Sequence, residues 1–259
     1  MKQSLQVAIH QGIEASFAGL SWEQIPVELL PEHQPLGYQS AIALKLSAYS
    51  DRPPVDLAEE LLEFLSVQEH LSGFSLSLRS PGWIQFHYGD LALVKQLQAL
   101  PLTPLTLAHH TPFVDPHSPE VLTWQVAHAR CCALLRLAEH GGLIALEPST
   151  LKIVQPHPIP WLDGGYFQLV HPSEHTLIRS LLYIWDTLHD EPTASRLLSL
   201  TRTLSQDILR FEQNCRIWGS TLKENPPLSL SRLGLLAMGG KTLKTLLEQG
   251  LTLSAPPEW

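Results

Sequence analysis

The segment from Pro119 to Ala138, PEVLTWQVAHARCCALLRLA, constrains the fold of this chain more than any other stretch. Pro119 suits the first turn of a helix because proline lacks an N–H that this turn would leave unpaired, and Glu120 favours the positive end of the helix dipole. Apolar residues then recur at steps of three and four around most of the cylinder. The pattern predicts a largely buried helix. Its polar exceptions are His128, Arg130 and Arg136.

The length and composition allow two medium domains. A chain of 259 residues with 44% apolar side chains can bury a real core. No apolar run approaches the about 18 residues of a transmembrane helix, and MKQSLQVAIHQG at the amino terminus has no signal-peptide pattern. Because Cys131, Cys132 and Cys215 cannot all be paired, reduced buried thiols are expected. We therefore expect a folded cytoplasmic protein with no membrane partner.

The first hundred residues predict an α+β domain. Helical periodicity covers residues 5–17, 37–47, 55–67 and 91–100. Residues 74–78 and 84–88 alternate around Ser80-Pro81-Gly82, which predicts a hairpin, and 25–30, flanked by prolines, predicts an edge strand. The expected domain, residues 1–100, packs its helices on one face of a small antiparallel sheet.

The remainder predicts a Pro-rich linker at 101–118 and then an all-α helical bundle at 119–259. Gly141-Gly142 should end the first helix of the bundle, and the Pro-rich residues 146–165 should form a loop. A second helix should begin after His171 with Ser173 as its cap. Further helices are expected at 193–218, 228–238 and 241–249.

The charge is unevenly distributed. Met1–Asp115 holds five Lys and Arg against twelve Asp and Glu, a net of −7, and Pro116–Trp259 holds twelve against thirteen, a net of −1; together they give −8. Affinity for a phosphate backbone grows with each cation that displaces a counterion. The balance excludes a general nucleic-acid binder, and DNA is not expected as a partner. RNA binding would need a local basic patch.

The predicted helix at 119–138 carries a family signature. Its WQVAHARCCALLR resembles the helix that opens the anticodon-binding domain (DALR type) of arginyl-tRNA synthetases, where glutamine and tyrosine precede Ala-His-Ala-Arg. Gln125, His128 and Arg130 match this pattern, and Val126 stands at the tyrosine position. An exposed aromatic there could stack on an anticodon base, which is worth about 1–3 kcal/mol. The carboxyl-terminal LSLSRLGLLAMGGKTLKTLLEQGL with its Pro-Pro-Glu-Trp resembles the family's ending, with Trp259 in place of the last methionine.

The front of the chain resembles the same family. GYQSAIALKLS, PPVDLAEELLEFL and SPGWIQFHY follow the order of motifs in the amino-terminal additional domain of arginyl-tRNA synthetases, although the aspartate expected between Gly37 and Tyr38 is missing. In that family this domain touches the tRNA elbow. The resemblance maps the strand's aromatic and amide positions onto Trp83 and Gln85, which could stack on a base and bind its edge. The alternative is that both merely alternate on a strand.

The catalytic motifs of that family are missing between these regions. A synthetase has a nucleotide-binding domain there, with a His-x-Gly-His turn and a Lys-Met-Ser-Lys loop, and neither motif occurs in this sequence. The resemblance therefore implies the two tRNA-contacting ends of the enzyme joined directly, with no aminoacylation and no cofactor.

Candidate tRNA contacts come from both regions. Arg130 could bind a phosphate or pair with a carboxylate of the bundle. Arg196, Arg202, Arg210 and Arg216 could form a phosphate track, or a solvated face with Asp207 and Glu212 interleaved. Phe211 and Trp218 could be base platforms or core residues. The complete set of candidates is Trp83, Gln85, Gln125, Arg130, Arg210, Phe211, Trp218 and Trp259.

The sequence gives less support for a metal site or for a Cys-His nucleophile. His128 with Cys132, and His171 with His175, stand one helical turn apart, but no second pair has a matching spacing, so no metal site is predicted. Nothing singles out an activated thiol for a Cys-His nucleophile.

Three functions from different classes remain open. The first is a non-catalytic tRNA-binding protein, most readily for an arginine acceptor, that presents tRNA to a synthetase or a tRNA-modifying enzyme, or sequesters it. The second is a protein-binding adaptor or scaffold that has lost tRNA binding, which the acidic balance and Val126 favour. The third is an enzyme of an unrelated kind.

Overall fold

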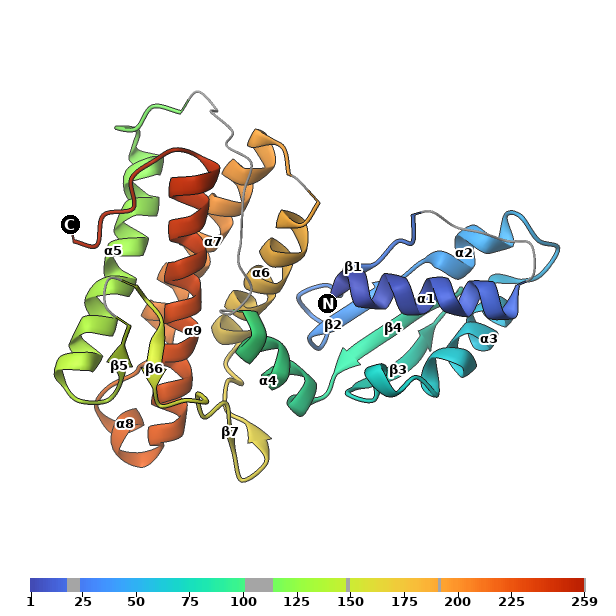
Figure 1. Ribbon diagram of the computed structural model, residues 1–259, viewed down its shortest axis with the longest axis horizontal. Helices are drawn as coiled ribbons and strands as arrows, with labels where there is room; N and C mark the ends of the chain where they lie inside the picture. Colours follow the sequence, from blue (N-terminus) through green and yellow to red (C-terminus); the bar gives the residue numbers. More distant parts are fainter. Residues whose placement is uncertain (18–23, 101–113, 148–149, 191, 259) are drawn as a thin grey trace. The chain divides into compact units, whose positions relative to one another are not determined.

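A computed structural model describes residues 1–17, 24–100, 114–147, 150–190 and 192–258. The chain divides into two compact units, Met1–Gln96 and Leu97–Trp259 (Figure 1). In the part of the chain that the structure describes, none of the helices has the length and hydropathy of a membrane-spanning segment.

Unit 1 combines a small sheet with helices, as the sequence predicts. Its strands are β1 (Glu28–Leu29), β2 (Gly37–Ser40), β3 (Phe74–Arg79) and β4 (Trp83–Tyr88), and they form an antiparallel sheet in the order β1-β2-β4-β3. Its helices are α1 (Lys2–Ser16), α2 (Ile42–Ser47), α3 (Pro54–Ser66) and the 3₁₀ turn η1 (Glu69–Leu71). The predicted hairpin is confirmed as β3–β4, and the predicted edge strand as β1.

The sheet of unit 1 has two chemically distinct faces. Ile84 and Phe86 belong to the core formed with the helices, and the cross-strand row Leu29, Tyr38, Phe86 and Leu76 points the same way. Successive side chains of a strand point to opposite faces. Trp83, Gln85 and His87 therefore share the other face, which we call the polar face of the sheet.

The prediction of one helix over 37–47 is wrong in its first half. Gly37–Ser40 is strand β2, and helix α2 begins only at Ile42. At Gly37, an added Cβ would lie 2.1 Å from the carbonyl oxygen of Phe86, so glycine lets the neighbouring strand approach closely. This pairing with β4 outweighs the local helical period.

Helix α4 (Asp90–Ala99) matches the helix expected at 91–100, and it spans the boundary between the two units. The expected linker at 101–118 lies largely outside the described residues.

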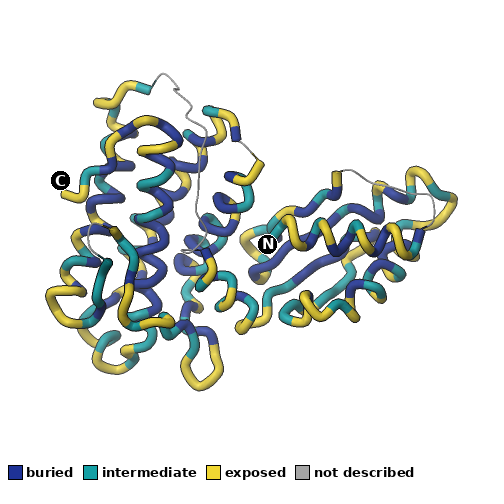
Figure 2. The backbone as a smooth tube through the Cα atoms, in the orientation of Figure 1, coloured by how far each residue is buried: buried dark blue, intermediate teal, exposed yellow. Residues whose placement is uncertain are grey.

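Unit 2 is built around five helices in its described part: α5 (Pro119–His140), α6 (Pro172–Leu188), α7 (Ala194–Asn214), α8 (Ser220–Glu224) and α9 (Pro226–Thr245), with the π-helical turn η3 (Leu246–Gly250). Helix α9 packs against α5, α6 and α7, and most of its length is buried (Figure 2). An added Cβ at Gly240 would lie 2.9 Å from Cβ of Cys131 on α5. Small residues therefore let the central helices approach closely.

Several element boundaries in unit 2 differ from the sequence-based expectation. The stretch 146–165 is not only loop, because β5 (Ala145–Leu146) pairs with β6 (Ile153–Gln155) and β7 (Leu162–Asp163) pairs with β8 (Tyr166–Phe167). Unit 2 is therefore not purely α-helical. Helix α7 ends at Asn214, and the two helices expected at 228–249 are one helix that continues into η3. The N-cap of α6 is His171 instead of Ser173, because the His171 side chain accepts from the Ser173 N–H.

Candidate nucleic-acid interface

A row of polar side chains crosses all four strands of the unit 1 sheet. Glu28 lies opposite Gln39, Gln39 opposite Gln85, and Gln85 opposite Ser77. We call Glu28, Gln39, Gln85 and Ser77 the polar row. Alternation puts this row on the polar face, beside Trp83 and His87.

Hydrogen bonds hold the amides of the polar row in place. Gln39 Nε2 donates to Glu28 Oε1 at 2.8 Å. Gln85 Nε2 donates to Gln34 Oε1 at 3.2 Å and to Gln39 Oε1 at 3.4 Å. The amide nitrogen of Gln85 is therefore engaged with two neighbouring glutamines, and the residue is only 7% exposed. The sequence singled out Gln85 but missed Gln34 and Gln39, whose role depends on strand pairing.

Trp83 is the accessible aromatic residue of this face. It is half-buried at the start of β4 and pairs across the hairpin with the exposed Arg79. Farther along β4, the His87 ring nitrogen Nε2 lies 3.0 Å from Ser77 Oγ. The arrangement offers a flat ring for stacking, an amide at its side and a cation at its edge. These are the groups that proteins use to hold an unstacked base.

Two of the arginines of unit 2 join α5 to α7. The Arg130 Nε donates to Glu212 Oε2 at 2.5 Å, and Arg202 pairs with Glu120. In both pairs the two residues are 82 positions apart. The second pair lies ten residues further along both helices, so α5 and α7 run parallel. At 1.5 Å per residue, the two ion pairs are about 15 Å apart. The hydrogen bond from Arg202 lowers the pKa of Glu120, and the bond to Glu212 raises the pKa of Arg130.

The remaining candidates of unit 2 lie in different environments. Arg210 pairs with Asp207 at 3.2 Å, and Phe211 is fully buried. Phe211 is therefore a core residue, and its position does not fit a base platform. Trp218 is half-buried beyond the end of α7, and Trp259 lies outside the described residues. The structure brings no continuous positive strip together from Arg130, Arg202 and Arg210, because each contacts a carboxylate.

The signature residues of α5 hold the carboxyl-terminal segment. Gln125 Nε2 donates to Oγ of Ser254 at 2.9 Å and to its carbonyl oxygen at 3.1 Å. The His128 Nδ1–H donates to the carbonyl of Pro256 at 2.9 Å, and Arg136 donates to the carbonyl of Pro257 at 2.9 Å. Desolvation lowers the pKa of His128, so the ring is held neutral. Gln125, 7% exposed, is thus a structural residue in this conformation.

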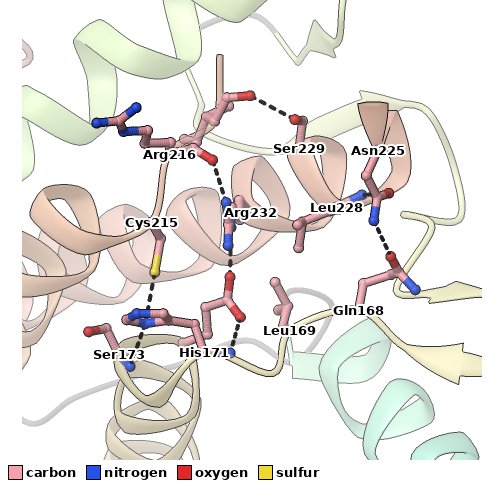
Figure 3. Close-up of polar contacts among 12 residues, drawn as sticks. Gln168, Leu169, His171, Ser173, Cys215, Arg216, Asn225, Leu228, Ser229 and Arg232 are labelled. Carbon is pink, nitrogen blue, oxygen red and sulfur yellow. Dashed lines mark hydrogen bonds and ion pairs between the residues drawn. The ribbon is translucent and has the colours of Figure 1, made fainter. Parts of the chain in front are cut away.

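A buried ion pair fixes the start of α6 against α9 (Figure 3). The Arg232 Nε donates to Glu174 Oε1 at 2.6 Å, and the other Glu174 oxygen accepts from the His171 N–H at 2.7 Å. Arg232 also donates to the Arg216 carbonyl. The Glu174 and Arg232 side chains are 0% and 11% exposed. Sequence reasoning missed this pair, although an arginine within the apolar run of α9 was a signal that it needed a buried partner.

The described residues offer little support for a metal site or for a reactive cysteine. Within the described ranges, no group of three His, Cys, Asp or Glu side chains is placed to hold a metal ion. His175 Nε2 is bonded to the Leu169 carbonyl at 2.8 Å. Burial raises the pKa of the Cys131 and Cys132 thiols, and it raises that of Cys215 to about 12. None of the three is an activated nucleophile.

Comparison with known proteins points to arginyl-tRNA synthetases. Residues 2–88 match the family model described as the arginyl tRNA synthetase N terminal domain. The arginine–tRNA ligase of Gloeobacter violaceus is 34% identical over 148 residues, which cover 55% of this chain and 22% of that protein. The ligase of a Synechococcus species is 29% identical over 133 residues, covering 50% and 21%. No solved structure shows significant similarity.

The similarity covers most of unit 1 and about half of the chain. Most of unit 1 matches the model of the arginyl tRNA synthetase N terminal domain, and about half of the chain is similar in sequence to these ligases. The similarity supports a tRNA-related origin. The matched part spans about a fifth of the length of the curated relatives.

Proposed function

We propose that the protein binds tRNA without charging it, with an arginine-acceptor tRNA as the first candidate, and that it presents or sequesters the bound tRNA. The observation that carries this proposal is the polar face of the unit 1 sheet, where Trp83 and Gln85 lie side by side on one strand of the domain that matches the synthetase N-terminal family. The absence of the His-x-Gly-His and Lys-Met-Ser-Lys motifs from these 259 residues supports the non-catalytic part.

On the polar face, we assign the stacking contact to Trp83 and a base-edge contact to the Gln85 carbonyl oxygen. Arg79, opposite Trp83, is exposed and can pair with a phosphate. Unit 1 is otherwise acidic, so RNA would be held by these few groups and not by a broad basic surface. This favours recognition of a single unstacked base in a loop over binding along a duplex.

For unit 2, we propose an anticodon-binding-like helical domain of the DALR type, on the strength of the α5 signature. Arg130 and Arg210 remain its phosphate-contact candidates, and Trp218 and Trp259 its aromatic ones. The Arg130 and Arg210 side chains are each 55% exposed, so a phosphate can reach their guanidinium groups, although their carboxylate partners are largely buried.

A protein-binding adaptor or scaffold is the second candidate. The specific observation in its favour is that Arg130, Arg202 and Arg210 each already contact a carboxylate. A surface neutralised in this way attracts RNA weakly and can face another protein without a large charge penalty.

A filter-binding assay over a salt series tests the two candidates against each other. Total tRNA is used first, followed by individual acceptors and a duplex RNA of equal length as the control. Specific binding should discriminate among acceptors and weaken as salt rises. If no tRNA is retained at low salt, or if the duplex binds as well as any tRNA, the tRNA-binding proposal fails.

A further inference from the structure

Strand β3 forms one edge of the unit 1 sheet, because the strand order is β1-β2-β4-β3 (Figure 1). It has six residues, FSLSLR, and its pairing with β4 is regular from Phe74 to Arg79. An edge strand presents a row of backbone N–H and C=O groups that have no sheet partner, and proteins usually protect such a row. The two edges of this sheet differ in that protection.

The opposite edge, β1, is protected. It has only two residues, lies between Pro26 and Pro31, and carries an exposed carboxylate at Glu28. Short length, proline and charge are the usual devices against pairing between sheet edges. Strand β3, all of whose residues the structure describes, has no proline and no bulge, and its one charged residue is Arg79 at the last position. The β3 edge is therefore open to pairing.

Hydrogen bonds at the end of the hairpin show which backbone groups of β3 face outward. The Gly89 N–H donates to the Gly73 carbonyl at 2.9 Å, so these two residues form a hydrogen-bonded pair one position before Phe74. In an antiparallel ladder, hydrogen-bonded pairs alternate with non-bonded pairs. The N–H and C=O groups of Phe74, Leu76 and Leu78 therefore point away from β4.

A second bond gives the same phase of alternation. The Tyr88 N–H on β4 donates to the Leu36 carbonyl at 3.0 Å, so the even-numbered residues of β4 bond toward β2 and the odd-numbered residues toward β3. Across the described part of the chain, the outward backbone groups of Phe74, Leu76 and Leu78 have no hydrogen-bond partner. Three donors and three acceptors thus form a row along this edge.

The side chains of β3 suit pairing with a second β3. Phe74, Leu76 and Leu78 pack against the core of unit 1 but are only half-buried. When two copies pair antiparallel about a two-fold axis at Leu76, Phe74 lies opposite the partner's Leu78, and the two Leu76 residues face each other. This register forms six interstrand hydrogen bonds, which use every outward group of both strands. It also puts apolar side chains opposite apolar ones.

The two ends of β3 differ in charge. Arg79 is exposed at the carboxyl end, whereas Glu69 and Asp90 are exposed beside the amino end, the latter next to the Gly89 that bonds to Gly73. Antiparallel pairing about Leu76 places each Arg79 opposite the partner's Gly73, close to these carboxylates. Opposite charges therefore meet at both ends of the paired strands, and this complementarity favours a second copy as the occupant.

We propose that β3 is a dimerisation edge, where a second copy of the chain pairs antiparallel through its own β3 and the two sheets become one sheet of eight strands. Such an interface is isologous, so it closes at two copies and does not extend into a filament. Pairing uses the edge of the sheet, whereas the proposed base contacts Trp83 and Gln85 lie on its polar face. The dimer therefore does not depend on tRNA binding.

Sedimentation velocity of the full-length protein over a concentration series tests the oligomeric state, and backbone amide hydrogen exchange identifies the edge. A monomer–dimer equilibrium is expected. Exchange of the Leu76 N–H should slow as the dimer forms, whereas the Ser77 N–H, which faces β4, should be protected at every concentration. A monomer throughout the series overturns the proposal, as does a dimer in which the Leu76 N–H remains unprotected.

Variants of the strand separate edge pairing from other modes of association. Leu76→Pro removes the central outward N–H of each copy, and it breaks no bond to β4. Because two of the six interstrand bonds are lost, the dissociation constant of the dimer should rise roughly tenfold or more. Leu76→Val keeps the N–H and should dimerise normally. Arg79→Glu changes an exposed residue and should weaken the dimer several-fold by placing like charges together.

Circular dichroism decides which comparison applies. If Leu76→Pro folds and dimerises as well as Leu76→Val, the proposal is overturned. If Leu76→Pro does not fold, the Arg79→Glu comparison takes its place, and normal dimerisation of that variant overturns the proposal.

Discussion

The polar face of unit 1 and the α5–α7 surface of unit 2 differ in how their polar groups are used. On the sheet, neutral amides bond to one another and leave Trp83 and Arg79 accessible. On the helices, Arg130, Arg202 and Arg210 are paired with carboxylates from the facing helix or from the preceding turn. The comparison teaches that cation content is a poor guide to an RNA surface. The second half of the chain holds twelve of the seventeen Lys and Arg residues, and three of its arginines contact carboxylates, whereas the more acidic first half carries the candidate base-binding groups Trp83 and Gln85.

The largest expected effect tests whether the arginines of unit 2 are structural. Arg232→Met removes the partner of Glu174 and leaves a buried carboxylate uncompensated, so the free energy of unfolding should fall by about 3–5 kcal/mol. Urea unfolding followed by circular dichroism measures it. The double variant Arg232→Met with Glu174→Leu should recover part of the loss. A loss below about 1 kcal/mol in the single variant would mean that the pair contributes little.

The second-largest expected effect concerns the contact of tRNA with the polar face of the sheet. Trp83→Ala should weaken tRNA binding by about 1–3 kcal/mol, or roughly fivefold to 150-fold, because a stacking platform is removed while the core face of the sheet is untouched. Filter binding measures the affinity, and circular dichroism checks the fold. Gln85→Ala should also weaken binding. Unchanged affinity in both variants would show that the polar face does not contact tRNA.

Gln125→Leu tests the contact between α5 and the carboxyl-terminal segment. The variant loses two hydrogen bonds to Ser254 and should destabilise the protein by about 1–3 kcal/mol. Urea unfolding measures the change, with tRNA affinity measured in parallel. A large loss of tRNA binding without a loss of stability would instead make Gln125 a direct contact.

His128 should make stability depend on pH. Because burial lowers its pKa below the ordinary 6.5, the unfolded chain takes up a proton below about pH 6.5 that the folded protein does not bind. Stability should therefore begin to fall near pH 6.5 and keep falling as the pH drops further, towards the lowered pKa of the folded protein. His128→Gln, which keeps a donor for the Pro256 carbonyl, should show a smaller fall when urea midpoints are compared across this range. Equal slopes in the two proteins would contradict the assignment.

The smallest effect concerns a pair that is exposed on one side. Arg130→Gln breaks the ion pair with Glu212, in which Arg130 is 55% and Glu212 18% exposed, so stability should fall by about 1 kcal/mol. Thermal unfolding at low and high salt measures it. If tRNA affinity falls strongly in this variant, the α5–α7 surface takes part in binding after all, and the contrast between the two surfaces weakens.

Local sequence patterns predicted most of the helices and the main hairpin. The helical period predicted α1, α3, α4 and α5, and the alternation around Ser80-Pro81-Gly82 predicted the β3–β4 hairpin. These predictions succeed because helical steps of three and four residues and the two-residue alternation of strands depend on neighbours in the sequence. The motifs quoted from the first domain agree with the family match over residues 2–88.

Long-range contacts decided the rest. Strand β2 forms because Gly37–Ser40 pairs with β4, more than forty positions away, and no periodicity within 37–47 contains that information. The same limit applies to Arg130 and Glu212, which are 82 positions apart, and to the burial of Phe211. The sequence by itself determined which segments are helices or hairpins, since that depends on local sterics and spacing. Only the tertiary structure decided which polar side chains are bonded to other groups of the protein and which remain accessible to a ligand. The physical reason is that desolvation and pairing are properties of the packed chain.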